Sequence, residues 1–486
     1  MYKNNYWFFI FLFLLSLNHT QLMGQKCHNR IIVDGLMHDW EGCETYCSDK
    51  IDDGKDVDFT RMWVTNDEKY LFIRIQLAKP LSLVDYNSLF LEIDGDHNAA
   101  TGYRVNGIGA ELGWGFGLRY GFYKHFSSAD YISNLDVRYV ILPSFTSTDF
   151  EIAIKLDAAP IRNEKIFTAD TIEILLWDKQ VGGDLLPDSG HVFHYVIQKD
   201  ISSPYQPLSI EPPFETSLRL MTWNVFYDGL IDTIRQPIFG KVFKAIQPDI
   251  IVMQECWHSQ ANEVKQLFDQ WLPLQKGSWK VIHTGEGLML VSRYPVVKAD
   301  PIFVGDNRNI AAYSIKTDLF NLDTLLLIGV HLSCCAQDNE RIAETQAIMH
   351  YLGKHYSIGR NEDKLLRLPV VIAGDFNLVG SEIPYRNIVS NQLTGAREPW
   401  FTDLAPHQID RPMAYTWRDY SKVFSPSRLD YIFYSPLFNP IHSYIFNILY
   451  LDENSLKRYG LKPTDLRICS DHLPLVVDFV PTVSPK

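Results

Sequence analysis

Six segments of the sequence carry side chains suited to metal and phosphate chemistry, each within or directly after a short apolar run. These residues are Asn224 after LRLMTW, Glu255 after DIIVMQ, His331 after LLLIGV, Asp375 and Asn377 in VVIAGDFN, Asp430 in RLDYIF, and Asp471 and His472 in SDHLPLVV. Side chains at the ends of separate strands commonly converge into one site. Carboxylates and amides supply oxygen ligands for magnesium, whereas His and Asp are common general acids and bases. The set therefore predicts one site that binds metal and phosphate.

Each residue type favours a role. Glu255 is the first candidate for a metal ligand, and Asn224 could offer its carbonyl to metal or its amide to a phosphate oxygen. Asp375 is placed to orient or deprotonate an attacking water, and Asn377 to reach the phosphate. The alternative for GDFN is a simple turn motif.

His472 and Asp430 are expected to form a pair. A carboxylate beside an imidazole fixes its tautomer and favours its charged form. A charged His472 would stabilise negative charge that develops on phosphorus-bound oxygens during hydrolysis.

The elements that must position these residues fall into two regions. The C-terminal region alternates strands, at 218–222, 249–253, 325–330 and 369–373, with a helical period at 339–353. That pattern predicts layered α and β structure. Residues 28–200 contain short strand-like runs separated by turns, at 70–76, 88–93, 137–142 and 150–156, which predict a β-sandwich.

A proline-rich stretch separates the regions and sets the boundaries. Residues 203–216 are predicted to be a linker, with a β-sandwich domain at 25–202 and a catalytic domain at 217–481. Residues 1–24 have the apolar run YWFFIFLFLLSL followed by polar residues, and predict a signal peptide. We therefore expect a secreted or periplasmic protein, with one disulfide among Cys27, Cys43 and Cys47.

Charge is distributed unevenly along the chain. The net charge is −13, of which 217–486 carries −1 and the preceding residues −12. No basic footprint for nucleic acid is visible, yet a bound metal could supply local positive charge for a polyanionic substrate.

The C-terminal motifs MTWNV, PDIIVMQE, HL, GDFN, RLDYIF and SDHLPL resemble, in order, the endonuclease/exonuclease/phosphatase superfamily, which includes deoxyribonucleases, inositol polyphosphate phosphatases and neutral sphingomyelinases. The resemblance implies a four-layer α/β/β/α sandwich, so that the whole chain is α+β with a preceding β-sandwich. It also implies hydrolysis of phosphate esters with Mg²⁺ or Mn²⁺. Asp471 matches a second metal-facing carboxylate, and His331 a residue that contacts phosphate or protonates the leaving oxygen.

Further residues are candidates for supporting roles. By resemblance to pancreatic deoxyribonuclease, Glu286 would orient His331. Arg308 and Arg341 could clamp phosphate, although a surface arginine is the simpler interpretation of both. A disulfide between Cys256 and Cys334 or Cys335 would join two catalytic loops.

The N-terminal motifs IVDGLMHDW and IDGDHNAATGY resemble family-9-like carbohydrate-binding β-sandwiches. A glycan partner is thus one expectation for this domain. Asp94, Asp96 and Asn98 alternate as Ca²⁺ ligands could, with Glu111 as a later contributor, or they form a hairpin turn. Trp40, Trp63 and Trp114 could stack on sugars, but core packing is the commoner role of such residues.

The sequence therefore predicts a secreted, metal-dependent phosphoesterase that cleaves a phosphodiester of nucleic acid or phospholipid with an activated water. Two alternatives stay open. One is a sugar- or inositol-phosphate monoesterase, and the other is a carbohydrate-binding protein with a degenerate hydrolase domain.

Overall fold

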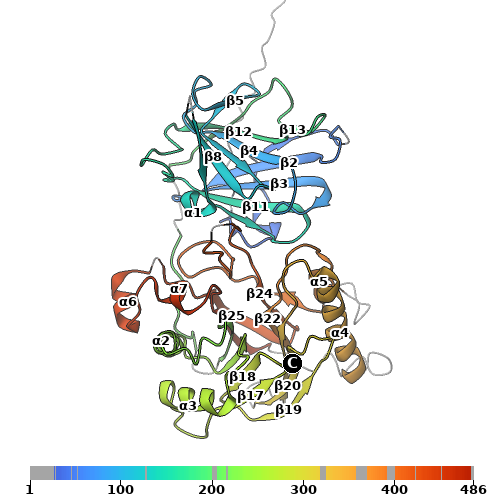
Figure 1. Ribbon diagram of the computed structural model, residues 1–486, viewed down its shortest axis with the longest axis vertical. Coiled ribbons are helices and arrows are strands. Elements are labelled where there is room, and N and C mark those ends of the chain that lie inside the picture. Colours follow the sequence, from blue (N-terminus) through green and yellow to red (C-terminus); the bar gives the residue numbers. More distant parts are fainter. Residues whose placement is uncertain are drawn as a thin grey trace, which may run out of the picture.

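The computed structural model describes residues 27, 29–44, 46–51, 53–125, 128–199, 205–214, 217–317, 324–356, 369–390, 400–421, 423–449 and 451–482. The expected signal peptide at 1–24 lies outside these residues. Figure 1 shows a β-rich N-terminal region stacked on a mixed C-terminal region. Among the described helices, none is long and apolar enough to cross a bilayer.

The N-terminal region is a β-sandwich of two antiparallel sheets. One sheet has the order β1-β2-β3-β11-β10, and the other has the order β13-β12-β4-β7-β8-β9 with β14 beside β12. The strands are β1 (Tyr46–Ser48), β2 (Phe59–Asn66), β3 (Tyr70–Leu81), β4 (Leu89–Asp94), β7 (Leu112–Gly115), β8 (Tyr120–His125), β9 (Ser128–Ile132), β10 (Val140–Leu142), β11 (Ser147–Lys155), β12 (Thr171–Asp178), β13 (Leu185–Leu186) and β14 (Phe193–Val196), with a separate hairpin of β5 (Tyr103–Val105) and β6 (Ile108–Ala110).

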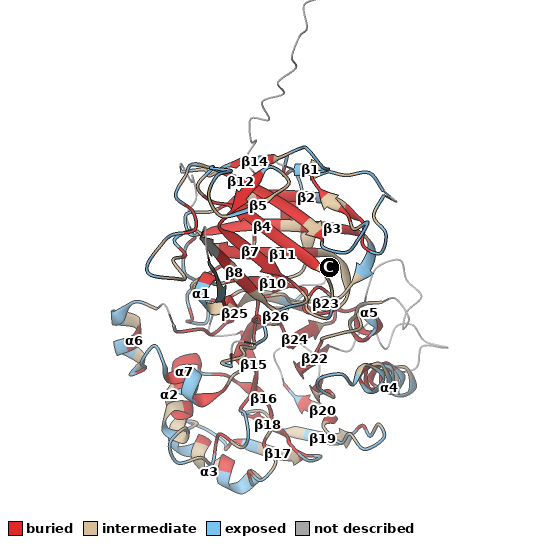
Figure 2. Ribbon diagram, turned by 45° about the horizontal axis from the view of Figure 1, so that its top comes forward, coloured by how far each residue is buried: buried red, intermediate tan, exposed pale blue. Residues whose placement is uncertain are grey.

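The core between these sheets is continuous and apolar. Leu71, Ile73 and Ile75 alternate along β3 and pack with Leu91 and Ile93 of β4. Figure 2 shows buried residues along the central strands of the sandwich. Trp40, Trp63 and Trp114 are buried as well, so none of them belongs to an open surface for stacking on sugars.

One expected strand is partly helical. The run 137–142 was expected to be extended, but α1 (Asn134–Val137) precedes β10. Asp136 accepts a hydrogen bond from the Ser133 backbone N–H at 2.7 Å, which completes a capping box around the first turn. Local capping thus overrides strand propensity at this point.

The C-terminal region contains two six-stranded sheets, ordered β17-β18-β16-β15-β26-β25 and β19-β20-β21-β22-β24-β23. Their strands are β15 (Leu218–Asn224), β16 (Ile250–Gln254), β17 (Lys280–Thr284), β18 (Leu288–Ser292), β19 (Val296–Pro301), β20 (Ile310–Lys316), β21 (Thr324–His331), β22 (Val370–Asp375), β23 (Thr402–Asp403), β24 (Asp430–Tyr434), β25 (Phe438–Ile445) and β26 (Leu475–Pro481). The helices are α2 (Gln236–Ile246), α3 (Ala261–Trp271), α4 (Asp338–Tyr356), α5 (Ile383–Val389), α6 (Glu453–Tyr459) and α7 (Asp465–Cys469).

Successive side chains of one strand point into different layers. Leu325 and Leu327 of β21 join the core shared by both sheets, whereas Leu326 and Ile328 pack beneath α4 and α5. Figure 1 shows α2, α3, α6 and α7 beside one sheet and α4 and α5 beside the other. The four-layer α/β/β/α arrangement and the α+β class are therefore confirmed.

The sandwich and the C-terminal region are joined by backbone pairing and apolar packing. The backbone N–H of Val33 donates to the carbonyl of Pro412 at 2.9 Å, and that of Thr146 donates to the carbonyl of Gly380 at 2.7 Å. The proline-rich stretch also packs on the C-terminal region, since the Tyr205 hydroxyl donates to the carbonyl of Gln408 at 2.7 Å. The stretch is therefore a fixed connection over 205–214 rather than a free tether.

A buried ion pair connects the first and last strands of this region. The Arg219 guanidinium donates from Nε and Nη2 to the two carboxylate oxygens of Asp478, at 2.8 and 2.7 Å, and both side chains are almost fully buried. Arg219 also donates to the carbonyl oxygens of Ile210 and Ile246. Every oxygen partner of the guanidinium lies in a water-poor interior, where an unpaired charge is costly.

Replacing Asp478 with Asn should lower the free energy of unfolding by about 3–5 kcal/mol, because Arg219 would stay buried without its counter-charge. Chemical denaturation measures this loss. The matched control is Glu211→Gln, which breaks the exposed pair between Glu211 and Arg458 and should cost less than about 1 kcal/mol. Equal effects of the two variants would contradict a special role of the buried pair.

Candidate active site

Strand pairing gathers the polar side chains at one edge of the two sheets. Asn224, the last residue of β15, is in parallel register with Gln254, so Glu255 follows beside it. In the second sheet, His331 of β21 lies opposite Asp375 of β22, and Asp375 lies opposite Asp430 of β24. These side chains are separated widely in sequence but are neighbours in space.

Asp375, Asp430 and His472 form a buried cluster whose candidate ligand atoms all lie within 4.8 Å of one another. The Nδ1 atom of His472 is 2.8 Å from Oδ2 of Asp430. Its Nε2 atom is 3.7 Å from Oδ2 of Asp375, and the Nε2 atom of His331 approaches the same oxygen at 3.8 Å. Two imidazoles thus face one central carboxylate.

This cluster keeps a positive charge on His472. Burial disfavours the charged imidazole, but the carboxylates of Asp430 and Asp375 outweigh that effect and raise the pKa of His472 above the ordinary 6.5. For Asp375, burial raises the pKa to about 6 although His472 opposes the shift. At neutral pH the site therefore combines an imidazolium with a carboxylate that can accept a proton.

A sequence profile of the endonuclease/exonuclease/phosphatase family matches residues 221–472, which span all of these side chains. The chain belongs to the endonuclease/exonuclease/phosphatase family. Enzymes of this family are metal-dependent phosphoric ester hydrolases, and this chain is one of them.

Several solved structures are similar to the family domain. TDP2 of D. rerio, with a single-strand DNA product, is 19% identical, covers 55% of this chain and 99% of its own, and has a TM-score of 0.38. A mannosyl-6-phosphatase of Bacteroides thetaiotaomicron is 17% identical over 54% of this chain and 100% of its own, with a TM-score of 0.38. A family protein of Bacteroides vulgatus is 19% identical over 55% and 100%, with a TM-score of 0.40. No curated protein matches the chain.

The residues at the opposite side of the cluster fit the divalent cation that the family uses. Glu255 accepts hydrogen bonds from Asn224 Nδ2 at 3.0 Å and from the Tyr227 backbone N–H at 2.8 Å. Asp471 accepts a bond from Trp417 Nε1 at Oδ2, whereas its buried Oδ1 has no hydrogen-bond partner within the described part of the chain. Two carboxylates with spare lone pairs suit a hard cation such as Mg²⁺ or Mn²⁺.

Asn224 links the two halves of the site. Its Nδ2 donates to both Glu255 and Asp375, the latter at 3.1 Å, and its Oδ1 accepts the Phe226 backbone N–H at 3.0 Å. Those bonds use the atoms that were expected to contact phosphate or metal, so the geometry favours a positioning role. Asn377 is engaged similarly, since its Nδ2 donates to the carbonyl of Leu332 at 2.9 Å.

The expected supporting residues lie elsewhere. Glu286 and Arg308 are mostly exposed and approach each other at 3.9 Å, and Nδ1 of His331 has no hydrogen-bond partner among the described residues. Glu286 therefore does not hold the ring of His331. Arg341 is neither a surface residue nor a phosphate clamp. It is fully buried, pairs with Asp338, and donates to the carbonyl of Ser333 at 2.8 Å, which braces the loop before α4.

The cysteines form one disulfide, between Cys27 and Cys43, as expected for the N-terminal group. The disulfide proposed for Cys256 is wrong, because Cys256 is a free thiol buried beside the site. Cys334 and Cys335 are free and exposed, and they line the catalytic cavity.

The expected calcium ligands come together only in part. Asp94, Asp96 and Glu111 place carboxylate oxygens within 4.8 Å of one another. Asn98 instead uses its side-chain oxygen to accept the Ala100 backbone N–H at 3.1 Å. Glu111, which was expected as a later contributor, therefore lies with Asp94 and Asp96.

The catalytic cavity has a volume of about 890 Å³ and two kinds of wall. The family domain contributes Glu255, His331, Asp375, Asp471 and His472. The β-sandwich contributes Trp114 and also Leu83, Tyr86, Phe116 and Tyr139, which sequence reasoning missed because they lie far away along the chain. Asp85 and Arg119, which pair with each other, line the cavity beside these mostly apolar residues. A side chain of the family domain, Phe424, also reaches this apolar side.

A second pocket, of about 420 Å³, adjoins the cavity and shares Trp417 and Asp471 with it. Arg235, Arg418 and Arg467 line this pocket. The Nε and Nη2 atoms of Arg418 are buried and have no hydrogen-bond partner among the described residues. The sequence contains only a weak signal for this pocket, because Arg418 lies in TWRDY, in a loop between two family motifs.

Replacing Asp430 with Asn should lower kcat about 10²-fold at pH 8. His472 would lose the positive charge that stabilises the negative charge developing on the phosphoryl oxygens. Without the Asp430 carboxylate, the pKa of His472 falls, so His472 loses its proton at lower pH. The alkaline limb of the pH–rate profile should therefore move to lower pH by about one to two pH units.

The control for this variant is Asp452→Asn. Asp452 caps α6 at the surface, where its side chain accepts the backbone N–H groups of Asn454 and Ser455. That variant should keep the wild-type profile, since Asn is also a good capping residue. An unshifted alkaline limb in Asp430→Asn would contradict the role given to the pair.

Proposed function

We propose that this protein is a secreted phosphodiesterase that uses Mg²⁺ or Mn²⁺ and an activated water, with a phosphodiester chain as its substrate. The disulfide between Cys27 and Cys43 supports an oxidising compartment. The observation that carries the substrate choice is Arg418, a partly buried cation next to Asp471 whose buried Nε and Nη2 atoms have no hydrogen-bond partner among the described residues.

Burial of guanidinium N–H groups without acceptors is costly, so an anion in this pocket would compensate the two buried nitrogen atoms of Arg418. Arginine also matches phosphate geometry, because its N–H groups form a planar fork. The pocket adjoins the catalytic cavity, as both include Trp417 and Asp471. A substrate with one phosphate at the cluster and a second at Arg418 therefore fits a phosphodiester chain, such as a single nucleic-acid strand.

The cluster residues have distinct roles in the proposed hydrolysis. The Asp375 carboxylate accepts a proton from water as the water oxygen forms its bond to phosphorus. The bond from phosphorus to the leaving oxygen then breaks, and His331 donates a proton to that oxygen. The charged His472 stabilises the negative charge that develops on the phosphoryl oxygens. Glu255 and Asp471 would hold a divalent cation, which would supply further positive charge to a phosphate oxygen.

Arg418→Gln should raise KM for a short single-stranded oligonucleotide roughly tenfold, since about 1.4 kcal/mol of binding to the second phosphate would be lost. Hydrolysis of bis(p-nitrophenyl) phosphate, which has one phosphate, should be unchanged. Steady-state kinetics with both substrates measures the difference.

Two matched variants sharpen this comparison. Arg458→Gln removes an exposed arginine that pairs with Glu211 and should change neither KM. Arg418→Lys keeps the charge and should recover part of the lost affinity. Equal losses on the two substrates would instead place Arg418 at the reacting phosphate or in folding.

Chelation with EDTA should abolish hydrolysis, and Mg²⁺ or Mn²⁺ should restore it. In Glu255→Gln, the Mg²⁺ concentration for half-maximal rate should rise at least about tenfold, because a ligand would lose its negative charge. The control is Glu263→Gln, an exposed position on α3, with an unchanged requirement. Activity that survives chelation would contradict the metal dependence of the proposed reaction.

A compact phosphomonoester, such as a sugar or inositol phosphate, is the second candidate. The specific observation in its favour is the sandwich wall of the cavity, where Leu83, Tyr86 and Phe116 line the same space as the catalytic side chains. Release of inorganic phosphate from such esters, with oligonucleotides left intact, would favour this candidate over phosphodiester cleavage.

A further inference from the structure

His97, Glu173 and His194 form a cluster on the β-sandwich that has no part in the phosphoesterase site. The loop before β4 contains Val84 and Asp85, which line the catalytic cavity. β4 then runs from Leu89 to Asp94, and His97 lies in the turn beyond its far end. In Figure 1 this end, next to β5, points away from the catalytic region.

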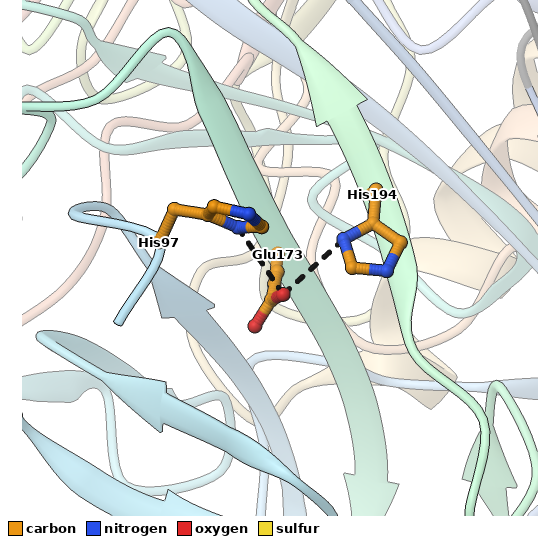
Figure 3. Close-up of side chains that lie close together, drawn as sticks. All are labelled: His97, Glu173 and His194. Carbon is orange, nitrogen blue, oxygen red and sulfur yellow. Dashed lines mark ion pairs between the residues drawn. The ribbon is translucent and has the colours of Figure 1, made fainter. Parts of the chain in front are cut away.

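Three separate segments hold the cluster in place. Glu173 of β12 lies directly opposite His194 of β14 in antiparallel register, so their side chains share one face of the sheet. His97 has a backbone φ of +56°, an uncommon left-handed conformation for histidine. Figure 3 shows that both rings turn a nitrogen toward the same carboxylate.

The distances match those between ligands of a single metal ion. Nδ1 of His97 and Nδ1 of His194 lie 3.3 and 3.2 Å from Oε1 of Glu173. All three candidate ligand atoms lie within 4.8 Å of one another. Bonds of about 2.0–2.1 Å at a tetrahedral angle place two zinc ligands about 3.3 Å apart.

The surrounding charge favours a cation. Glu173 is buried, and Asp94 is its direct neighbour across the sheet on β4. Asp94 also belongs to the carboxylate group with Asp96 and Glu111. Among the described residues, no lysine or arginine forms an ion pair with any of these four carboxylates. Protonation of both nearby imidazoles would place two positive charges side by side, whereas one divalent ion bound to neutral rings avoids that repulsion.

We propose that His97, Glu173 and His194 bind a divalent transition-metal ion, Zn²⁺ by preference, with two imidazole nitrogens and one carboxylate oxygen. Nitrogen ligands select zinc-like ions over Ca²⁺ and Mg²⁺. The two histidine side chains are about half exposed, at 46% and 52%, so the fourth position faces solvent. The ion would fasten the turn after β4 to β12 and β14.

The test uses tag-free, full-length protein titrated with Co²⁺, whose visible absorption reports tetrahedral nitrogen coordination. Wild type should bind one equivalent of Co²⁺ more than His194→Ala, and the tetrahedral bands should disappear in that variant. Glu173→Gln keeps both imidazole rings and the shape of the Glu173 side chain but removes its negative charge, so it should weaken the same bands. The catalytic centre contributes equally to all variants and cancels in the difference.

The matched control is His191→Ala, an exposed histidine three residues from His194 on the same segment. It should retain the extra equivalent and the bands. Zn²⁺ at about a hundredfold excess over its Kd should raise Tm by roughly 5 °C in wild type and in His191→Ala, but not in His194→Ala.

Identical stoichiometry and spectra in wild type and His194→Ala would overturn the proposal. Complete displacement of Co²⁺ by millimolar Ca²⁺ would also overturn it, because it would place the ion on the oxygen ligands of Asp94, Asp96 and Glu111. Magnesium-dependent hydrolysis should be the same in all these variants, so the result does not depend on the proposed phosphodiesterase activity.

Discussion

The packing of two sheets face to face is the constraint on which the rest of the structure depends. It buries both faces of β15, β16, β21 and β22, so these strands are mostly apolar, and the buried polar side chains Arg219 and Thr222 within β15 are hydrogen-bonded. The side chains of the site lie where the strands end, and parallel pairing of β15 with β16 and of β21 with β22 brings those ends to one edge. The site is thus placed by backbone register, and its chemistry is added by the residue at each terminus.

Charge balance then decides how the site can work. On one side, Asp375 lies between two imidazoles while Asp430 maintains the charge of His472. On the other side, the hydrogen-bond donors to Glu255 and Asp471 among the described residues are an amide, a backbone N–H and an indole, all uncharged, and a divalent ion would supply the missing charge. A phosphate bound between the two sides would meet positive charge from both, and Asn224 fixes their separation by bridging Glu255 and Asp375.

The sequence predicted those features of the structure that depend on the local pattern of residues. The apolar strands with polar ends and the helix near 339–353 follow from periodicity and from residue types at strand ends. The pair of Asp430 with His472 was expected from the family motifs that contain these residues. The sequence could not predict long-range contacts of flexible side chains. In the sequence, Arg341 has the pattern of an exposed helical arginine. In the fold, it lies in the first turns of α4 and donates to the carbonyl of Val379 in a neighbouring loop. The partial misassignment of 137–142 arose because the capping of α1 competed with strand propensity.

The β-sandwich shows why a domain boundary can hide part of a site. Its wall of Leu83, Tyr86 and Phe116 belongs to a cavity whose acids and bases lie more than 100 residues further along the chain. The residues before Ser217 also carry nearly all of the excess negative charge, which repels a polyanion. The proposed phosphodiester chain would therefore enter with a phosphate toward Arg418 and its uncharged groups toward Leu83, Tyr86 and Phe116. In this arrangement the N-terminal domain would select the orientation of the substrate, a role that neither domain could fulfil alone.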